Sequence, residues 1–477
     1  MVKENKAKDL TQTSIYTIFE YLYRFLFILM VPFLKQVLLA IVNPKEITNL
    51  ITLSSISAVS IIFLAYLSYL KKQYLFQNNV LEFRKGVLLK HSSFLKSERL
   101  KTILLRKTVG TSFFSSSKIF IGTLANVKYK TEISLTLKNP SIKNFYNFFF
   151  TKQKISKVYK AKFHRIFLIS LLYSNPIRGI IFFLPFLDRL GNLIGNQSRN
   201  YFYKTLDLGL GLISLNVKPA TFVLIRTILV GCSIAFILSV VKNLKLKSYW
   251  TDNEIYISSG LINKNEIVIK KNSVNALIIR QNAFMKIFKI YNVYLNAVSH
   301  KKARLDRNPI LIGCTKKEIK KILPIFSHFF VQSNNKISMP KFSKWWFFLN
   351  PISVLFLSIV VFIFILKIDK QQILIIPAVF LFFACLCFFI VKISAFKTSG
   401  ISSSSNFLFI NSYSLFSNYM VLTELKKVSL YKINKNALFP KSKTCELQIF
   451  IYSQNKKQFK IKNLPINNLS KFLSYAF

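Results

Sequence analysis

The chain has 477 residues, of which 52% are hydrophobic and 15% aromatic, and 68 Lys and Arg residues against 17 Asp and Glu give a net charge of +51. Such hydrophobicity excludes a disordered chain, and the length favours several units, some of them in a lipid bilayer. A basic chain can also bind nucleic acid, but no groove-reading motif is present, so we expect no nucleic-acid partner.

The N-terminal region predicts a membrane hairpin over residues 15–70. Its basic start lacks a small-residue cleavage site after a short apolar core, which indicates a retained membrane segment rather than a removable signal. Apolar runs at 21–42 and 46–70 are each near the roughly 20 residues needed to cross about 30 Å of hydrocarbon. The turn sequence NPK separates them.

Two further hairpins are predicted in the same way. The second covers 166–241, with runs at 166–187 and 220–241, and the third covers 345–391, with runs at 345–366 and 372–391. Trp345 and Trp346 at the start of the third suit an interfacial aromatic belt.

Polar, Lys-rich stretches with short alternating runs follow each hairpin, at 71–165, 242–344 and 392–477. Alternation of apolar and polar residues predicts β-strands, so each stretch is expected to be a β domain. Shifting 76–122 by 174 places it on 250–296 without a gap, and a shift of 154 gives a weaker third copy. The sequence therefore predicts one module repeated three times.

Local signals define the expected architecture of a module. Gly260 sits in EIYISSGLI, where a glycine allows the positive φ of a turn between two strands. Thr315 and Glu318 form a capping-box pattern, so the second module is expected to end in a helix. We expect an α+β membrane protein in which an antiparallel sheet with a C-terminal helix follows each of three transmembrane hairpins.

At this point the residues resemble a known family. The order of strands after a two-helix hairpin is similar to the bacterial pleckstrin-homology-like domain of YdbT-like polytopic membrane proteins. The residues that carry the resemblance are Gly86, Gly260, Gln281 and Phe284, while Ser414, Lys107 and Lys435 depart from it. The resemblance implies three hairpin-plus-domain units and a membrane-associated protein without a settled biochemical activity.

Little in the chain points to catalysis or to a metal or other cofactor. The four histidines are scattered without a metal-ligand spacing, and the five cysteines include no CxxC pair. The fragment GLG at 209–211 lacks the context of a phosphate loop. We expect neither enzymatic activity nor catalytic residues, metal or cofactor.

Three basic residues, Lys35, Arg178 and Arg226, lie inside apolar runs. An ionisable side chain at a helix centre costs about 2.5 to 3.5 kcal/mol on insertion scales. The simpler interpretation is that these side chains reach the head groups. The alternative is that they hold an anionic lipid phosphate between the hairpins.

Charge predicts the orientation. Residues 71–165 contain 21 Lys and Arg against 3 acids, and the connectors NPK and KIDKQ are short and nearly neutral. The positive-inside rule then places the N-terminus and all three modules in the cytoplasm of a multi-pass plasma-membrane protein. The heavy use of Lys, Asn, Ile, Phe and Tyr indicates a bacterium with an AT-rich genome.

The predicted function is an inner-leaflet platform that binds anionic lipids or scaffolds proteins, including a second PH-like membrane protein. The candidate lipid-binding residues are Arg106, Lys107, Arg280, Lys286, Lys289, Lys301 and Lys302. A solvated basic surface inflated by codon usage is the simpler alternative. A transporter or lipid-translocating protein is the other, because six helices could form a bundle.

Overall fold

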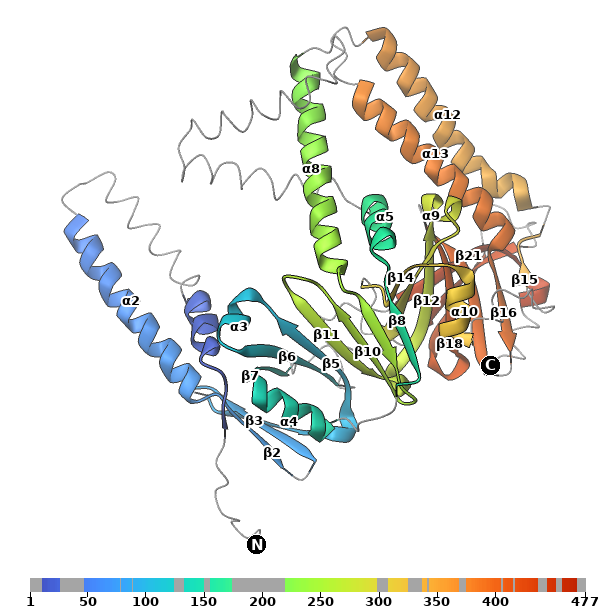
Figure 1. Cartoon of the computed structure of the whole chain (residues 1–477). Helices are drawn as coiled ribbons and strands as arrows, with labels where there is room; N and C mark the ends of the chain where they lie inside the picture. The colour runs from blue at the N-terminus through green and yellow to red at the C-terminus, as the bar shows by residue number, and fades with distance from the viewer. Residues whose placement is uncertain are drawn as a thin grey trace.

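The structure is a computed structural model with a mixed α+β fold (Figure 1). It describes residues 11–25, 47–77, 79–87, 89–123, 133–149, 155–173, 219–297, 308–324, 337–340, 343–368, 375–404, 406–414, 417–435, 444–451 and 457–469.

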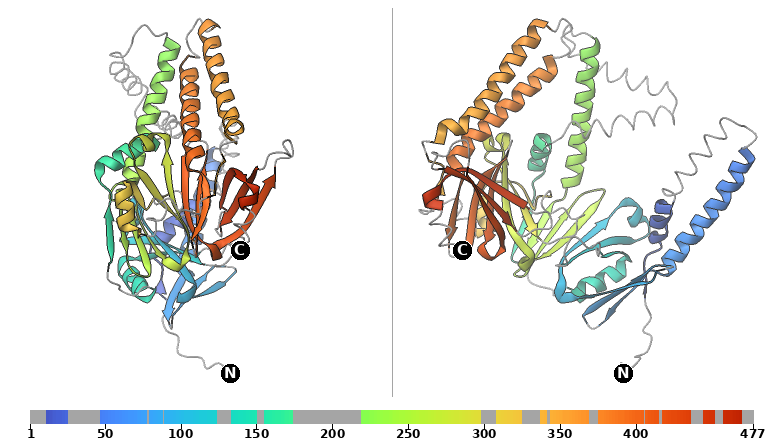
Figure 2. Two further views of the ribbon diagram at one scale, coloured as in Figure 1. Left: turned by 90° about the vertical axis from the view of Figure 1, so that its right-hand side faces the viewer. Right: turned by 180° about the vertical axis from the view of Figure 1, so that it is seen from behind.

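Four long helices consist mostly of apolar residues: α2 (Ile47–Leu70), α8 (Pro219–Asn243), α12 (Lys344–Ile368) and α13 (Ile375–Thr398). Large apolar side chains remain exposed on them, including Phe63 on α2, Phe356 on α12 and Phe383 on α13. All four helices leave the strand layers on the same side (Figures 1 and 2). A helix that is apolar on every side is typical of a protein core or a bilayer.

The described residues contain fewer membrane-length helices than the six predicted runs. Two helices are long and apolar enough to cross a bilayer, Phe347–Lys367 and Leu381–Thr398, whereas Ser55–Leu70 and Val230–Asn243 are shorter apolar segments. Most of the runs at 21–42 and 166–187 lies outside the described residues. The pair α12 and α13 is the described hairpin, and its two helices pack side by side (Figure 1).

Three groups of strands follow α2, α8 and α13, and we name them the first, second and third strand units. The first consists of β2 (Gln73–Gln77), β3 (Val80–Lys85), β4 (His91–Lys96), β5 (Leu100–Lys107), β6 (Ser116–Thr123), β7 (Ile133–Lys138) and the helix α4 (Asn139–Phe149). The second consists of β9 (Lys247–Trp250), β10 (Glu254–Ser259), β11 (Lys264–Lys270), β12 (Val274–Asn282), β13 (Tyr291–Ala297), β14 (Leu311–Cys314) and the helix α10 (Lys316–Ile322). The third consists of β16 (Gly400–Ser404), β17 (Phe407–Tyr413), β18 (Ser417–Glu424), β19 (Val428–Lys435), β20 (Thr444–Ile451) and β21 (Lys457–Pro465).

The three units share local details at equivalent positions. A 3-10 turn joins the third and fourth strand of each unit, at Ser97–Arg99, Lys271–Ser273 and Leu425–Lys427. The next strand then carries a register shift one residue after its start, at Leu100, Val274 and Val428. These turns are related by offsets of 174 and 154 residues, which are the offsets found in the sequence.

Successive units are joined through continuous sheets, which the sequence analysis did not predict. β5 of the first unit pairs with β11 of the second, and β12 of the second pairs with β18 of the third. The result is two seven-stranded sheets, β7-β6-β5-β11-β10-β9-β8 and β14-β13-β12-β18-β17-β16-β15. We call β5·β11 the first joint and β12·β18 the second joint.

The two joints use the same register. Thr102 is opposite Ile269 in the first joint, and Ala276 is opposite Thr423 in the second. These positions correspond through the same offsets of 174 and 154. The joints are therefore two copies of one geometric relation between neighbouring units.

The hydrophobic cores also cross the joints. Val268 of β11 belongs to the cluster of the first unit, with Ile103 and Leu105. In the same way, Phe409 and Leu422 of the third unit belong to the main cluster of the second. A strand at a joint is thus buried on both faces, one against its own unit and one against its neighbour.

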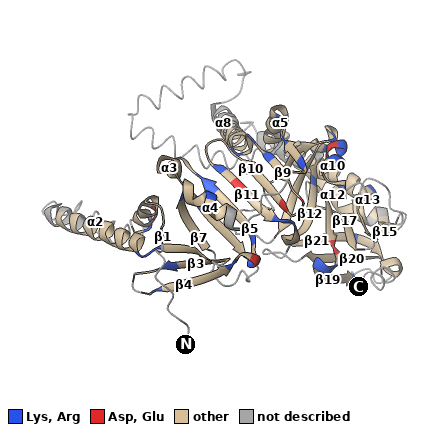
Figure 3. Ribbon diagram, turned by 60° about the horizontal axis from the view of Figure 1, so that its bottom comes forward, with Lys and Arg blue, Asp and Glu red and all other residues tan. Residues whose placement is uncertain are grey.

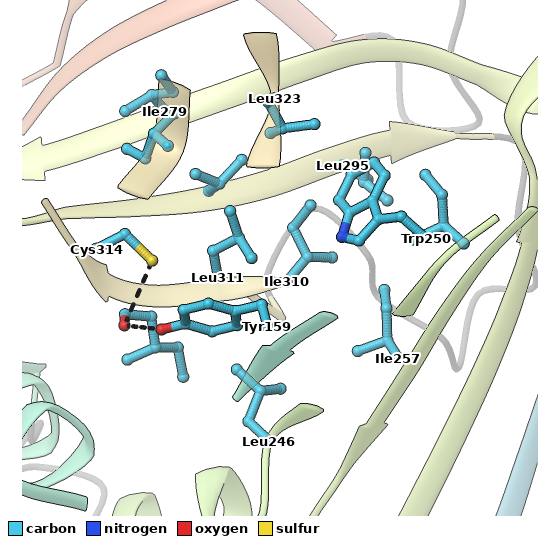
Figure 4. Close-up of a cluster of buried hydrophobic side chains, with 14 of the residues drawn as sticks. Tyr159, Leu246, Trp250, Ile257, Ile279, Leu295, Ile310, Leu311, Cys314 and Leu323 are labelled. Atoms are coloured by element: carbon cyan, nitrogen blue, oxygen red, sulfur yellow. Dashed lines mark hydrogen bonds between the residues drawn. The ribbon is translucent and has the colours of Figure 1, made fainter. Parts of the chain in front are cut away.

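A short strand before each helical segment pairs with the first strand after it. β1 (Thr11–Gln12) pairs with β2, β8 (Lys157–Lys160) with β9, and β15 (Ile337–Ser338) with β16. Within β8, Tyr159 enters the core of the second unit, where its hydroxyl donates a 2.6 Å hydrogen bond to the carbonyl of Ile312 (Figure 4). Both ends of the three helical segments therefore return to the strand layer at neighbouring points.

Candidate functional site

The strand units have two chemically different ends. At the end that faces away from the helices, the described turn residues are 79, 97–99, 251–253, 271–273, 406 and 425–427, and all except Leu425 are polar or charged. At the other end, the turn after β3 exposes 74% of Leu89, and the turn after β10 exposes Leu261 and Ile262. Gly260 in this second turn donates its amide to the carbonyl of Leu244, at the C-terminal end of α8.

Two short helices complete the end that faces the long helices. α3 (Val109–Phe113) follows the first joint, and α9 (Ala283–Ile287) occupies the equivalent place after the second. Phe113 of α3 is 85% exposed, and Phe284, Ile287 and Phe288 are also exposed. We call the described turn residues 86, 87, 89, 90 and 260–263, together with α3, α9, Phe288 and Lys289, the helix-proximal rim.

The rim is attached to the helices. The ring centroid of Phe114, directly after α3, lies 5.1 Å from that of Phe19 in the helix at 16–25. In α9, Lys286 donates a 2.5 Å hydrogen bond from Nζ to Oγ of Ser394 on α13. Burial and the nearby Lys397 lower the pKa of Lys286 below its ordinary value. The rim is therefore held where the helices emerge from the strand units.

Basic residues are spread over the described strands and turns, and acidic residues are sparse (Figure 3). Of the candidate lipid-binding residues, Lys107, Lys286 and Lys289 lie on or beside the rim, and Lys289 has a positive φ of 53° just after α9. Lys301 and Lys302 lie outside the described residues. Three of the candidate residues thus lie at the helix-proximal end of the strand units, Lys107 at the first joint and Lys286 and Lys289 after the second.

Arg106 and Arg280 occupy equivalent positions in the two joints. Arg106 donates from Nε to Oδ1 of Asn265 at 3.1 Å, and Arg280 donates from Nε to Oγ of Ser417 at 3.1 Å. The guanidinium of Arg280 also lies 5.5 Å from the ring centroid of Tyr419. Both side chains contact the neighbouring unit across the joint. The spacing of residues in the sequence did not indicate these contacts.

A pocket of about 180 Å³ opens at the first joint, between the sheet and α4. Lys107 and Lys264 are direct cross-strand partners on its lining, and Glu266 and Tyr146 also line it. Burial and the nearby Glu266 raise the pKa of Tyr146, so this hydroxyl stays protonated. Because like charges directly opposite each other destabilise a strand pair, an anion between the two lysines would offset their repulsion.

The remaining pattern residues have structural positions that explain their type. Gly86 and Gly260 have φ values of 109° and 96°. The buried side-chain amide of Gln281 donates to the carbonyl of Ile290 at 3.2 Å and holds the loop that contains α9. Phe284 is exposed on the rim.

Of the three basic residues predicted inside apolar runs, the structure places only the backbone of Arg226. Lys35 and Arg178 lie outside the described residues, and Arg226 lies within α8 while its side chain lies outside them. Sequence analysis missed Lys72, which is 6% exposed directly after α2. Burial lowers its pKa to about 8, and its ammonium lies 5.7 Å from the ring centroid of Tyr21.

The second strand unit, with α8 before it and α10 after β14, forms the central part of this arrangement. Residues 205–323 match the bacterial PH domain family. The chain therefore contains a bacterial PH-like domain, and its described part runs from α8 to α10. No curated protein is a match for the chain.

Both joints involve the residues that match the family. β11 and β12 are consecutive strands of the PH-like domain, and each pairs with a strand from a different neighbouring unit. The PH-like domain thus contributes α9 and the turn 260–263 to the rim. Its strands β11 and β12 each have a paired strand on both sides.

Proposed function

We propose that the protein is a multi-pass protein of the bacterial plasma membrane, with three PH-like units on the cytoplasmic side. It acts as a platform that binds anionic lipids of the inner leaflet, without enzymatic activity and without nucleic acid as a partner. The observation that carries the proposal is the helix-proximal rim, which combines exposed apolar side chains with lysines at the end nearest the long helices.

The rim has the chemistry of a surface that rests in the head-group region. Fully burying a side chain such as Phe or Leu is worth about 1.5 to 3 kcal/mol, so Leu89, Phe113 and Ile287 favour a place out of water. Lysines near an anionic surface add about 1 kcal/mol each. The polar turns at the opposite end of the units suit the aqueous side.

The pairing of flanking strands supports three hairpins. β1, β8 and β15 each bring the chain back beside the strand that follows the next helical segment. A segment that leaves and re-enters the strand layer at one point crosses a bilayer an even number of times. Exposed Trp345 at the start of α12 fits the head-group level.

We expect a tryptophan at position 113 to contact acyl chains. In the full-length chain reconstituted with lipids brominated on the acyl chain, Phe113→Trp should add fluorescence that the bromines quench, because this position is 85% exposed on the rim. Val158→Trp is the matched control, since Val158 is 48% exposed on β8, where it lies opposite Tyr249 and away from the rim. The native chain, with its three tryptophans, supplies the baseline. Equal quenching of both added tryptophans would contradict a rim in the membrane.

We expect Lys107, in the pocket at the first joint, to determine which lipid head group the protein retains. Lys107→Glu should abolish preferential retention of phosphatidylglycerol over phosphatidylcholine at this pocket, measured by native mass spectrometry of the full-length chain. The fold should be maintained, because the new carboxylate would face Lys264 as an opposite charge.

Lys271→Glu, on a turn at the polar end, is the matched charge reversal for this experiment. It should retain phosphatidylglycerol like the native chain. An equal loss in both variants would indicate general charge attraction, and no selectivity in the native chain would reject the lipid-binding proposal.

A further inference from the structure

Two strands that are equivalent to the strands of the joints, β4 and β19, lie at sheet edges. In the part of the chain that the structure describes, β4 pairs with β3 alone and β19 pairs with β20 alone. Both edges carry exposed apolar side chains: Phe94 of β4 is 68% exposed, and Leu430 and Ile433 of β19 are 57% and 39% exposed. Exposed edge strands of this kind are templates for pairing with another chain.

The two edges are the two halves of one further joint. β4 is the first unit's equivalent of β11 and β18, and β19 is the third unit's equivalent of β5 and β12. Applying the offsets of 174 and 154 to the internal joints places Ser92 opposite Ile433 and Leu95 opposite Leu430. The internal pairs at the position of Ser92 and Ile433 are Glu266 with Leu105 and Met420 with Ile279.

Phe94 corresponds to the residues that enter a neighbour's core. Its equivalents, Val268 in β11 and Leu422 in β18, are 1% and 3% exposed and lie in the clusters of the preceding units. In the part of the chain that the structure describes, β19 pairs with β20 alone and is exposed along most of its length. Among these residues, the core of the third unit therefore receives no strand equivalent to those that the first and second units receive from their neighbours.

We propose that β4 of one copy pairs with β19 of a second copy, so that the chains assemble head to tail and Phe94 enters the core of the partner copy's third unit. Both internal joints keep the long helices on one side of the strand layer (Figure 2). A third joint of the same geometry places the helices of the second copy on that side as well. Such a heterologous contact extends into a row or closes into a ring.

Disulfide trapping in membranes tests the register. One tagged population carries Ser92→Cys and a second, with a different tag, carries Ile433→Cys, so any product that contains both tags joins two chains. We expect a cross-link for this pair under mild oxidation, because directly opposed residues lie within the roughly 4.4 to 6.8 Å Cα separation of a disulfide. Ser92→Cys with Tyr431→Cys is the control, since Tyr431 is a diagonal neighbour of Ser92 in this register, about 7 to 8 Å away, and Phe94 stays in place.

The assembly is tested independently by substitution at Phe94. Phe94→Asp should reduce co-purification of differently tagged copies to the level of a mixture made after solubilisation, because it places a charge in the partner's core. Phe94→Leu should retain co-purification, and the exposure of this site in the single chain predicts that both variants fold. The proposal would be overturned by equal trapping of the matched and diagonal pairs, or by the absence of trapped product from folded protein. Co-purification that Phe94→Asp leaves unchanged would also overturn it. The readout does not depend on lipid selectivity, so it is independent of the proposed lipid binding.

Discussion

Ile278→Asp is expected to unfold the second and third strand units together. Ile278 lies on β12 and is 1% exposed, opposite Tyr294 on one side and Val421 on the other. Its side chain belongs to the cluster formed mainly by the third unit. An unpaired carboxylate at such a site should lower the free energy of unfolding by roughly 4 kcal/mol or more.

Chemical unfolding of the full-length protein in detergent measures the size of this loss, and limited proteolysis maps it. New cleavage should occur in both β13 and β20, because the substituted side chain lies in a core shared across the second joint. Val158→Asp is the control, since Val158 lies exposed on the edge strand β8. A third unit that stays protected in Ile278→Asp would show that the cores are independent.

Gly260→Ala is expected to cause the second large loss of stability. Gly260 has a φ of 96°, and a Cβ atom there would lie 2.1 Å from the backbone carbonyl oxygen of Asn263. A backbone atom cannot move aside as a flexible side chain can, so the turn must change shape. Strain of this kind costs about 1 to 3 kcal/mol before the steric conflict is added.

The matched control is Gly110→Ala in α3. The nearest atom to a Cβ at Gly110 is Cε2 of the Tyr16 side chain at 3.1 Å, and alanine favours a helix by about 0.5 to 1 kcal/mol over glycine. We therefore expect a small change at Gly110 and a lowered melting temperature at Gly260. Similar melting temperatures for the two variants would contradict the assigned turn geometry.

Local features of this fold follow from short stretches of sequence. Alternation in EIYISSGLI predicts strand, glycine turn and strand. The structure has β10 and a positive-φ Gly260 at these residues, but β11 begins only at Lys264, so Leu261 and Ile262 lie in the turn. The Thr315 and Glu318 pattern predicts a helix start, and α10 begins there with both hydrogen bonds of the capping box. These outcomes depend on neighbours within a few residues, which is the range that sequence patterns encode.

The candidate site was predictable only where it depended on such local signals. Phe284 and Lys286 lie in α9, which the offset of 174 residues aligns with α3, and both are on the rim. Lys264 was missed because it faces Lys107 only after strands 157 residues apart have paired. Arg106 and Arg280 were selected for their charge, although each contacts a neighbouring unit across a joint.

The sequence by itself determined the four described apolar helices, most of the strands after them and the offsets between equivalent elements, because each depends on the order of nearby residues. Only the tertiary structure decided that β11 joins β5 and that β18 joins β12. The physical reason is that backbone hydrogen bonds are the same for every residue except proline, so an edge strand carries no local label for its partner. The choice is made when Val268 and Leu422 become buried in the cores of the preceding units.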